Sequence, residues 1–255
     1  MNIIRLPLEG TSNTRDLGGY VTKEHKLFKW KRALRSDCLS RLEQCDTEFL
    51  AHHYDLKKVI DLRSPQEVAL APNPYQTMDD VEYHNISLAD DVDPNMELES
   101  TFFSENFLRD FYVSVLEDKK ANLKKIIMEI SDVEKGSVIF HCTAGKDRTG
   151  VIAMLLLGIC GVSKQDIATN YMQTAVNLRY HQKFEDNLAK LMQQYKEVLS
   201  EQQLQKISSS NERDIEYTYD TLIERYGSFW DYFLEIGFTA LEIETLKKSL
   251  TEDIN

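Results

Sequence analysis

Residues 136–160 read GSVIFHCTAGKDRTGVIAMLLLGIC, and this stretch decides the fold. Residues 136–141 are a short apolar run that opens on a glycine, which predicts a central β-strand. Residues 149–160 are apolar on nearly every side, as expected for a helix buried in the middle of a domain. A strand, a polar loop and a buried helix in this order predict an α/β domain.

The flanking segments add strands before this stretch and helices around it. Two further runs predict strands, at residues 57–62 and 81–88. Pro65, Pro72 and Pro74 exclude a long regular element between them. Helical periodicity predicts helices at 102–117, 119–131, 180–206, 211–226 and 239–250. From Ser163 onward the chain is expected to be wholly helical, with Ser163 and Asp166 forming a capping box. The prediction is one domain over residues 1–255, with a partly parallel sheet flanked by helices.

Composition and charge exclude several classes of protein. Lys and Arg number 30 and Asp and Glu 42, so the net charge is −12, and we expect no nucleic-acid partner because nucleic acids reward a positive surface. No segment reaches the roughly 18 apolar residues that span a bilayer, and no signal peptide is recognised, so stable membrane insertion is not expected. The four cysteines form no metal-ligand spacing, which predicts reduced thiols, a cytoplasmic location and no metal.

The loop between the strand and the buried helix combines a nucleophile with a phosphate site. Cys142 lies where the strand ends, and five residues separate it from Arg148. A loop of this length can turn its backbone N–H groups inward to bind an anion, and the helix that follows adds its positive end. Arg148 offers a planar pair of donors that matches phosphate oxygens. Such a site favours a thiolate, so we predict that Cys142 attacks phosphorus and forms a phosphocysteine. The residues expected to bind phosphate are Thr143, Ala144, Gly145, Lys146, Asp147 and Arg148.

The neighbours of this cysteine have supporting roles in the prediction. Thr149 is expected to hydrogen-bond the sulfur and help it leave the phosphoryl group. His141 is expected to orient the loop through nearby backbone rather than to act as a base. The other cysteines, Cys38, Cys45 and Cys160, are expected to pack in the fold. The loop is not the nucleotide-binding GxxxxGK[ST] loop, which has no cysteine nucleophile.

The sequence HCTAGKDRTG at 141–150 resembles the HCxxGxxR[ST]G signature of cysteine-dependent protein tyrosine phosphatases. Further blocks resemble a bacterial branch of tyrosine and phosphoinositide phosphatases: NTRDLGGY at 13–20, LRSD at 34–37, DLRS at 61–64 with Glu67, and ERYGS at 224–228. The resemblance implies a phosphatase-type parallel sheet with phosphate bound at the end of the central strand. It also implies phosphotyrosine substrates, and in this branch phosphoserine, phosphothreonine and phosphoinositides as well.

The general acid is open between two sets of carboxylates. A phenolate is a poor leaving group, so a carboxylic acid should protonate it. The resemblance points to Asp147, because a myotubularin-type pattern uses the Asp directly before the loop arginine. The alternatives are upstream: Asp61 at a strand end, and Asp90, Asp91 and Asp93 in a polar loop.

Other polar residues near the blocks are also assigned expectations. Lys146 either engages an additional phosphate of a phosphoinositide or is a solvated surface lysine. Six charged residues in apolar neighbourhoods are expected to form ion pairs and hydrogen bonds that brace the loop, or one of them to contact substrate: Arg15, Asp16, Arg35, Asp37, Asp61 and Arg63. In related enzymes helices in this part of the chain cover the site, so residues 163–206 are a candidate lid. The alternative is a plain surface helix.

These observations predict a phosphomonoester hydrolase that acts on phosphotyrosine proteins or peptides, with breadth toward phosphoserine and phosphothreonine. It needs no cofactor, and inorganic phosphate is its product and inhibitor. The first alternative is a phosphoinositide phosphatase. The second, of another class, is a catalytically silent phosphate-binding module.

Overall fold

The computed structural model describes residues 5–89, 106–179 and 211–254. Its centre is a five-stranded sheet in the order β1 (Arg15–Asp16), β3 (Ala33–Ser36), β6 (Ser137–His141), β4 (Leu56–Asp61) and β5 (Glu82–Asn85). Four of these strands are parallel, and β1 runs antiparallel to β3. The predicted partly parallel sheet and its central strand are therefore confirmed.

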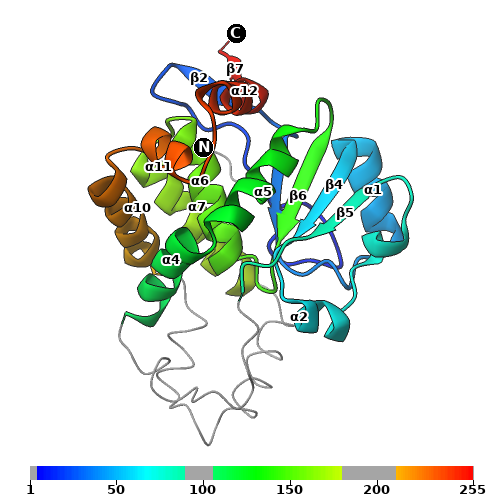
Figure 1. The fold of residues 1–255 in the computed structure, drawn as a ribbon. Helices are drawn as coiled ribbons and strands as arrows, with labels where there is room; N and C mark the ends of the chain where they lie inside the picture. Colours follow the sequence, from blue (N-terminus) through cyan, green and yellow to red (C-terminus); the bar gives the residue numbers. More distant parts are fainter. Residues whose placement is uncertain (1–4, 90–105, 180–210, 255) are drawn as a thin grey trace, which may run out of the picture.

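Alternate side chains of the strands build two cores, one on each face of the sheet. In β6, Val138 and Phe140 join the larger core and Ile139 joins the smaller one. The smaller core packs under α1 (Gln44–Tyr54) (Figure 1). The larger core lies under helices that gather on the other side of the sheet: α4 (Phe107–Asp118), α5 (Lys120–Ser131), α6 (Asp147–Ile159), α7 (Lys164–Arg179), α10 (Glu212–Tyr226), α11 (Phe229–Glu235) and α12 (Ala240–Leu250).

The central helix α6 is buried almost all round, as its apolar sequence predicts. It begins at Asp147, two residues earlier than the predicted boundary. Near its end, a Cβ on Gly158 would lie 2.4 Å from the ring of Phe229, so only glycine lets α11 pack this closely. The helix is thereby fixed at its far end while its first turn closes the cysteine loop.

Several short elements were not predicted from the sequence. They are β1, β2 (Lys26–Phe28), β3, α1, α2 (Pro65–Leu70), a 3₁₀ turn at Pro74–Thr77, α11 and β7 (Thr251–Asp253). The expectation of a wholly helical tail is wrong at its end, because β7 pairs antiparallel with β2. Lys29 Nζ reinforces this pairing by donating to the carbonyl oxygens of Lys248 and Ser249 at 3.0 and 3.2 Å. The helix predicted at 180–206 lies outside the described residues.

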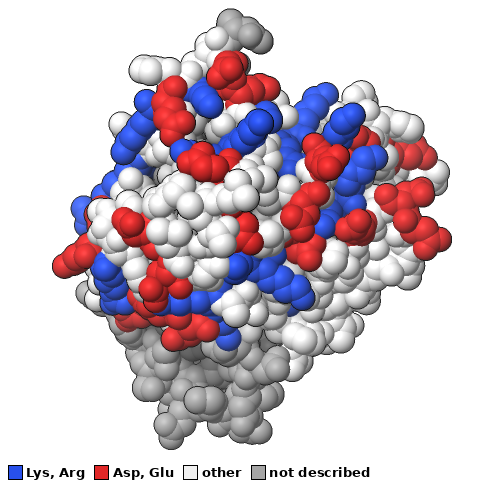
Figure 2. Space-filling model, turned by 45° about the horizontal axis from the view of Figure 1, so that its top comes forward, with Lys and Arg blue, Asp and Glu red and all other residues white. Residues whose placement is uncertain are grey.

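The surface does not separate the two signs of charge on the face seen in Figure 2, where acidic and basic side chains are interspersed. Within residues 5–89, 106–179 and 211–254, no helix has both the length and the apolar character that crossing a bilayer demands.

Candidate active site

The carboxyl ends of three parallel strands meet at one edge of the sheet, where Ser36 and Asp61 both pair with His141. Open α/β sheets bind their ligands at this edge. Cys142 follows directly and is buried, with 2% of its surface exposed. The loop then turns at Gly145, whose φ is +65°. A Cβ at Gly145 would lie 2.5 Å from the carbonyl oxygen of Ser36, so the loop can pack against β3 only with glycine there.

The scaffold holds this loop by its carbonyl oxygens. Asn13 Nδ2 donates to the oxygens of Ala144 and Gly145 at 3.0 and 3.2 Å. Arg35 Nη2 donates to the Gly145 oxygen at 2.7 Å, and the Cys38 amide donates to the Thr143 oxygen at 3.0 Å. Because N–H and C=O point in opposite directions across a planar trans peptide, the N–H groups that follow these carbonyls face away from the scaffold. Successive N–H groups aimed at one space would form an anion nest, and the anion-binding role of this loop stays a prediction.

Arg148 is oriented by Glu67 from the short helix α2. Its Nη1 and Nη2 donate to the two carboxylate oxygens at 2.6 and 2.9 Å. Glu67 is fixed in turn, because it forms a capping box with Ser64 at the start of α2. Burial alone would raise the pKa of Glu67, but the hydrogen bonds and charge of Arg148 outweigh it and lower that pKa to about 2. The same pairing outweighs the opposite effect of burial on Arg148 and raises its pKa, so both groups stay charged.

A second ion pair, which is fully buried, lies at the strand ends. Asp61 accepts hydrogen bonds from Arg63 Nε and Nη2 at 2.9 and 2.6 Å and from Tyr83 Oη at 3.0 Å. Burial alone would raise the pKa of Asp61, but the Arg63 hydrogen bonds hold it well below its usual range. A carboxylate held this firmly in its ionised form suits a supporting role better than proton donation. His141 is fully buried, and its Nδ1 lies 3.1 Å from the Cys142 carbonyl oxygen, in keeping with the expected contact to backbone.

Asp147 is the first residue of α6 and lies beside the loop. Its Oδ1 accepts a hydrogen bond from Tyr112 Oη and lies 3.5 Å from Lys146 Nζ. Tyr112 is in turn hydrogen-bonded to Tyr171 at 2.7 Å between the hydroxyl oxygens. The alternative acids Asp90, Asp91 and Asp93 lie outside the described residues.

Lys146 and Thr149 differ from their simplest expectations. Lys146 is 2% exposed, so the interpretation as a solvated surface lysine is wrong. Thr149 is fully buried, and in the described part of the chain its Oγ1 has no hydrogen-bond partner. The expected hydrogen bond from Thr149 to the cysteine sulfur is therefore not made in this structure.

Of the expected ion pairs and hydrogen bonds, Asp61 and Arg63 form an ion pair, and the other four charges form hydrogen bonds. Asp16 and Asp37 accept from backbone amides, at 2.7–2.9 Å. Across residues 5–89, 106–179 and 211–254, neither Arg15 nor Arg35 forms an ion pair with a carboxylate. They donate instead to neutral oxygens of Asn13, Asn170, Thr174 and the loop.

Arg35 places positive charge directly against the loop, and Arg15 reaches the loop through Asn13. Burial lowers the pKa of Arg35 to about 10, an effect that the nearby Cys142 opposes. Burial lowers the pKa of Arg15 as well, and Arg35 adds to the shift. A buried guanidinium without a carboxylate partner is costly unless an anion compensates it, and the loop is where an anion would bind.

The candidate lid divides at residue 180. Its first part, α7, packs firmly: Asn170 and Thr174 contact the buried arginines, and Asn177 Nδ2 donates to Asn13 Oδ1 at 3.1 Å. Asp166 N donates to Ser163 Oγ at 3.1 Å, which is one of the two hydrogen bonds of the predicted capping box. The part of the candidate lid from 180 to 206 lies outside the described residues.

The remaining cysteines differ in their burial, and Cys38 lies beside the loop, where its amide contacts Thr143. Cys160 is buried as expected and Cys38 is half-buried, but Cys45 is exposed, so packing is the wrong interpretation for it.

Among the described residues, Glu82, His84 and Glu129 approach closely enough to share a metal ion. Lys58 Nζ already lies 3.2 and 2.5 Å from the two carboxylates, so this group is an ion-pair network.

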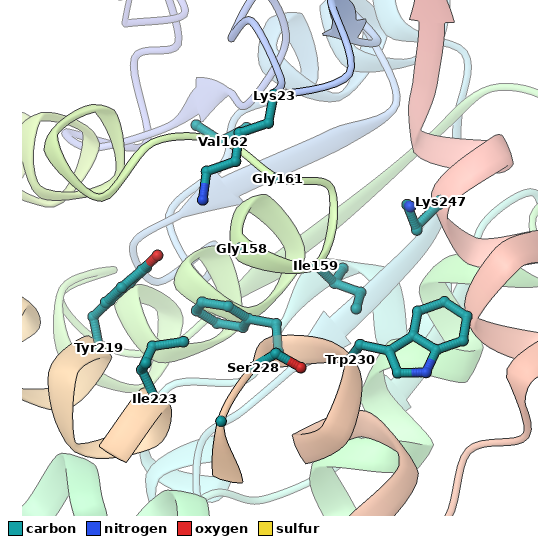
Figure 3. Close-up of a pocket in the computed structure, with 12 residues that line it drawn as sticks. Lys23, Gly158, Ile159, Gly161, Val162, Tyr219, Ile223, Ser228, Trp230 and Lys247 are labelled. Atoms are coloured by element: carbon teal, nitrogen blue, oxygen red, sulfur yellow. The ribbon is translucent and has the colours of Figure 1, made fainter. Parts of the chain in front are cut away.

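A pocket of about 410 Å³ opens at the far end of α6 from the loop. Figure 3 shows its apolar side chains, among them Ile223 and Trp230, together with Lys23 and Lys247. The loop residues do not line it. The 13-residue helix α6, about 20 Å long at 1.5 Å per residue, separates it from the cysteine.

Comparison with known proteins gives the chain its family. A tyrosine-protein phosphatase from Nostoc commune is 36% identical over 156 residues, which cover 61% of this chain and 52% of that protein. The chain thus spans about half the length of this curated relative. The crystal structure of TpbA from P. aeruginosa is similar at 16% identity, covering 61% of this chain and 77% of that one with a TM-score of 0.31. The family model described as "Tyrosine phosphatase family" matches residues 6–252, so the chain belongs to the tyrosine phosphatase family.

Proposed function

We propose that this chain hydrolyses phosphotyrosine in proteins or peptides through a phosphocysteine on Cys142. The observation that supports this most is the loop itself. The scaffold binds its carbonyl oxygens, so its N–H groups face the space beside the buried cysteine. Arg148 adds a guanidinium that Glu67 holds in one orientation. A nucleophilic sulfur inside a preorganised oxyanion site is the arrangement that phosphoryl transfer requires.

The first half-reaction uses the residues of the loop. The Cys142 thiolate attacks phosphorus, forming the S–P bond as the P–O bond to the tyrosine breaks. The loop amides and Arg148 bind the three oxygens on which negative charge accumulates. Asp147 delivers a proton to the departing phenolate oxygen, an effect worth about 10²- to 10⁴-fold for a positioned acid.

The second half-reaction regenerates the cysteine. A water molecule attacks phosphorus, Asp147 takes up its proton, and the P–S bond breaks to release inorganic phosphate. The buried hydroxyl of Thr149 is available to stabilise the departing thiolate. Inorganic phosphate, the product, binds the same donors and inhibits. This scheme needs no cofactor or metal, and the cytoplasmic location stays a prediction.

Phosphoinositides are a second candidate substrate class. The supporting observation is Lys146, whose ammonium lies 3.5 Å from Asp147 at the loop instead of in solvent. A second cation there suits a substrate with more than one phosphate. The same loop accommodates phosphoserine and phosphothreonine if the site is shallow enough for short side chains.

Phosphate release from a substrate panel tests the proposal. The panel holds phosphotyrosyl, phosphoseryl and phosphothreonyl peptides beside mono- and polyphosphorylated phosphoinositides, with Cys142→Ser as the blank. Release dominated by phosphotyrosine supports the proposal, and release dominated by polyphosphorylated lipids assigns the site to phosphoinositides. Tight phosphate binding without release by the wild-type chain would instead show a silent phosphate-binding module.

A further inference from the structure

We propose that Tyr112 is a positioning residue that fixes the Asp147 carboxyl for proton transfer to the leaving group, and that Tyr171 holds Tyr112 in place. The inference rests on the proposed phosphatase reaction. It adds a hydrogen-bonded chain of three residues: Tyr171 from α7, Tyr112 from α4 and Asp147 from α6. No sequence motif links these three residues to one another. Tyr112 is fully buried in α4, and its Oη donates to Asp147 Oδ1. Tyr171 Oη lies 2.7 Å from Tyr112 Oη, and the two rings meet edge to face.

The direction of the chain follows from counting protons. A phenol hydroxyl has one proton to donate, and a carboxyl oxygen that carries no proton only accepts. Tyr112 uses its proton on Asp147, so the hydrogen bond between the tyrosines is donated by Tyr171. Burial and the neighbouring Asp147 raise the pKa of Tyr112 and of Tyr171 well above the usual range of a phenol. Both hydroxyls therefore keep their protons, and Tyr112 remains a donor throughout the reaction.

This arrangement separates the two oxygens of Asp147. Oδ1 is occupied by the Tyr112 hydroxyl, and Lys146 Nζ lies 3.5 Å from the same oxygen. The proton that passes to the leaving group is therefore confined to Oδ2. With Oδ1 tethered, the carboxyl cannot rotate freely about its terminal bond, and near-attack geometry is held before substrate binds.

A structural explanation competes with this one. Buried tyrosine hydroxyls usually find a partner, and in this second explanation Tyr112 and Tyr171 only satisfy each other and the end of α6. The two explanations differ in how the rate responds to the leaving group. Protonation matters for a basic phenolate and little for an acidic nitrophenolate, whereas a damaged fold slows all substrates alike.

The test measures kcat/KM for wild type and Tyr112→Phe on a series of aryl phosphates. The leaving phenols of this series become more acidic from phosphotyrosine to 4-nitrophenyl phosphate. We expect Tyr112→Phe to lose about 10-fold on phosphotyrosine and less than about 2-fold on 4-nitrophenyl phosphate, a part of the full general-acid effect. Inhibition by inorganic phosphate should stay unchanged. Tyr171→Phe should show a smaller loss with the same trend, and it replaces Tyr112→Phe if that variant does not fold.

Tyr232→Phe is the matched control. Tyr232 is equally buried, and its Oη donates to the Leu116 carbonyl oxygen of α4 at 2.8 Å, away from Asp147. Tyr232→Phe removes a buried hydrogen bond from a hydroxyl to the same helix. Its effect on kcat/KM should not depend on the acidity of the leaving phenol. In an Asp147→Asn background, Tyr112→Phe should add no further trend, because the group it positions is gone.

The outcomes separate this inference from the proposed function. If wild type hydrolyses 4-nitrophenyl phosphate in a Cys142-dependent way but Tyr112→Phe slows all substrates equally, or none, the inference is overturned and the phosphatase reaction stands. An Asp147→Asn variant without a leaving-group trend also overturns it, since another group would be the acid. If wild type shows no Cys142-dependent hydrolysis, the proposed function fails and this inference fails with it.

Discussion

The guanidinium of Arg148 and the carboxylate of Glu67 face each other as two forks, with both terminal nitrogens donating at 2.6 and 2.9 Å. Paired bonds of this kind fix orientation as well as charge. A guanidinium has five N–H donors, so this pairing leaves three, and Nη2 also lies 3.4 Å from Thr143 Oγ1. Thr143 Oγ1 also donates to Glu67, which ties the carboxylate to the start of the loop. Glu67 therefore sets the orientation of the Arg148 guanidinium.

Replacing Glu67 with glutamine should weaken phosphate binding. Glu67→Gln replaces the carboxylate that accepts both Arg148 hydrogen bonds with a neutral amide. Arg148 therefore gains rotational freedom and the site loses preorganisation. We expect the inhibition constant of inorganic phosphate to rise about 10-fold, as for one charge-assisted contact. Glu129→Gln is the control, because Glu129 pairs with Lys58 away from the loop. An unchanged phosphate inhibition constant in Glu67→Gln would show that Arg148 orients itself without its partner.

The same carboxylate predicts an acid-sensitive part of the stability. Glu67 titrates near 4.3 in an unfolded chain, and in the fold its pKa is lowered to about 2, since Arg148 outweighs burial. A depressed pKa stabilises the fold above about pH 4.3, and that stabilisation is lost as the pH falls toward 2. Because the carboxylate is 32% exposed, we expect roughly 1–2 kcal/mol, less than the full shift implies. Urea unfolding of wild type and Glu67→Gln should differ most at pH 6–7, and the difference should shrink below pH 4 and vanish toward pH 2. A constant gap across that range would contradict this assignment.

The arginines beneath the loop predict strong stabilisation by anions. Arg15 and Arg35 are buried and bind neutral oxygens, so a dianion in the loop offsets their charge. Phosphate at 100 times its dissociation constant should stabilise the fold by about 2.7 kcal/mol, or a melting temperature rise of roughly 5–10 °C. Sodium chloride at equal ionic strength is the control. In Arg35→Gln the rise in melting temperature should be smaller at the same phosphate concentration. An equal rise would show that Arg35 does not contribute to anion binding.

Gly145 should not tolerate a side chain, because its φ is positive and its Cβ would clash with backbone. Gly237, which has a positive φ but no clash, distinguishes these two effects. Gly145→Ala combines a φ of +65° with a Cβ 2.5 Å from the Ser36 oxygen, so the loop must shift. We expect at least about a 100-fold loss in kcat/KM, as misplacement by 1 Å produces. Gly237→Ala is the control, because its φ is +95° but the nearest atom to its Cβ lies 3.8 Å away. It should cost about 1–2 kcal/mol of stability and leave catalysis intact. Full activity in Gly145→Ala would show that the loop does not depend on this turn.

The centre of the fold could be predicted from the sequence because its signals are local. The apolar run of β6, the cysteine loop and the apolar helix α6 lie in 25 consecutive residues, and each has its own pattern. The helices at 119–131 and 239–250 were found within a few residues of α5 and α12 by periodicity alone. These elements hold Cys142, Asp147 and Arg148 at the sheet edge.

The parts that could not be predicted depend on contacts between distant segments. Helix α2 has only six residues and opens on Pro65, so its sequence shows no helical period, although Pro65 suits the first position of a helix. Strand β1 has two residues, too few for any alternation to show. Tyr112 lies in a helix that periodicity predicted, but nothing in its neighbourhood indicates that Asp147, 35 residues away, is its partner. That Arg15 and Arg35 form no ion pair within the described part of the chain likewise appears only in three dimensions.

The central claim is that the phosphoryl group is transferred to the sulfur of Cys142 before water releases it. One measurement tests this claim directly. Wild-type chain is mixed with a phosphotyrosyl peptide, quenched within one turnover, digested and analysed by mass spectrometry. The account predicts a phosphoryl group on the peptide that contains Cys142, decaying as inorganic phosphate appears, and no release from Cys142→Ser. Steady phosphate release from Cys142→Ser, or a phosphoryl group on another residue, would contradict it.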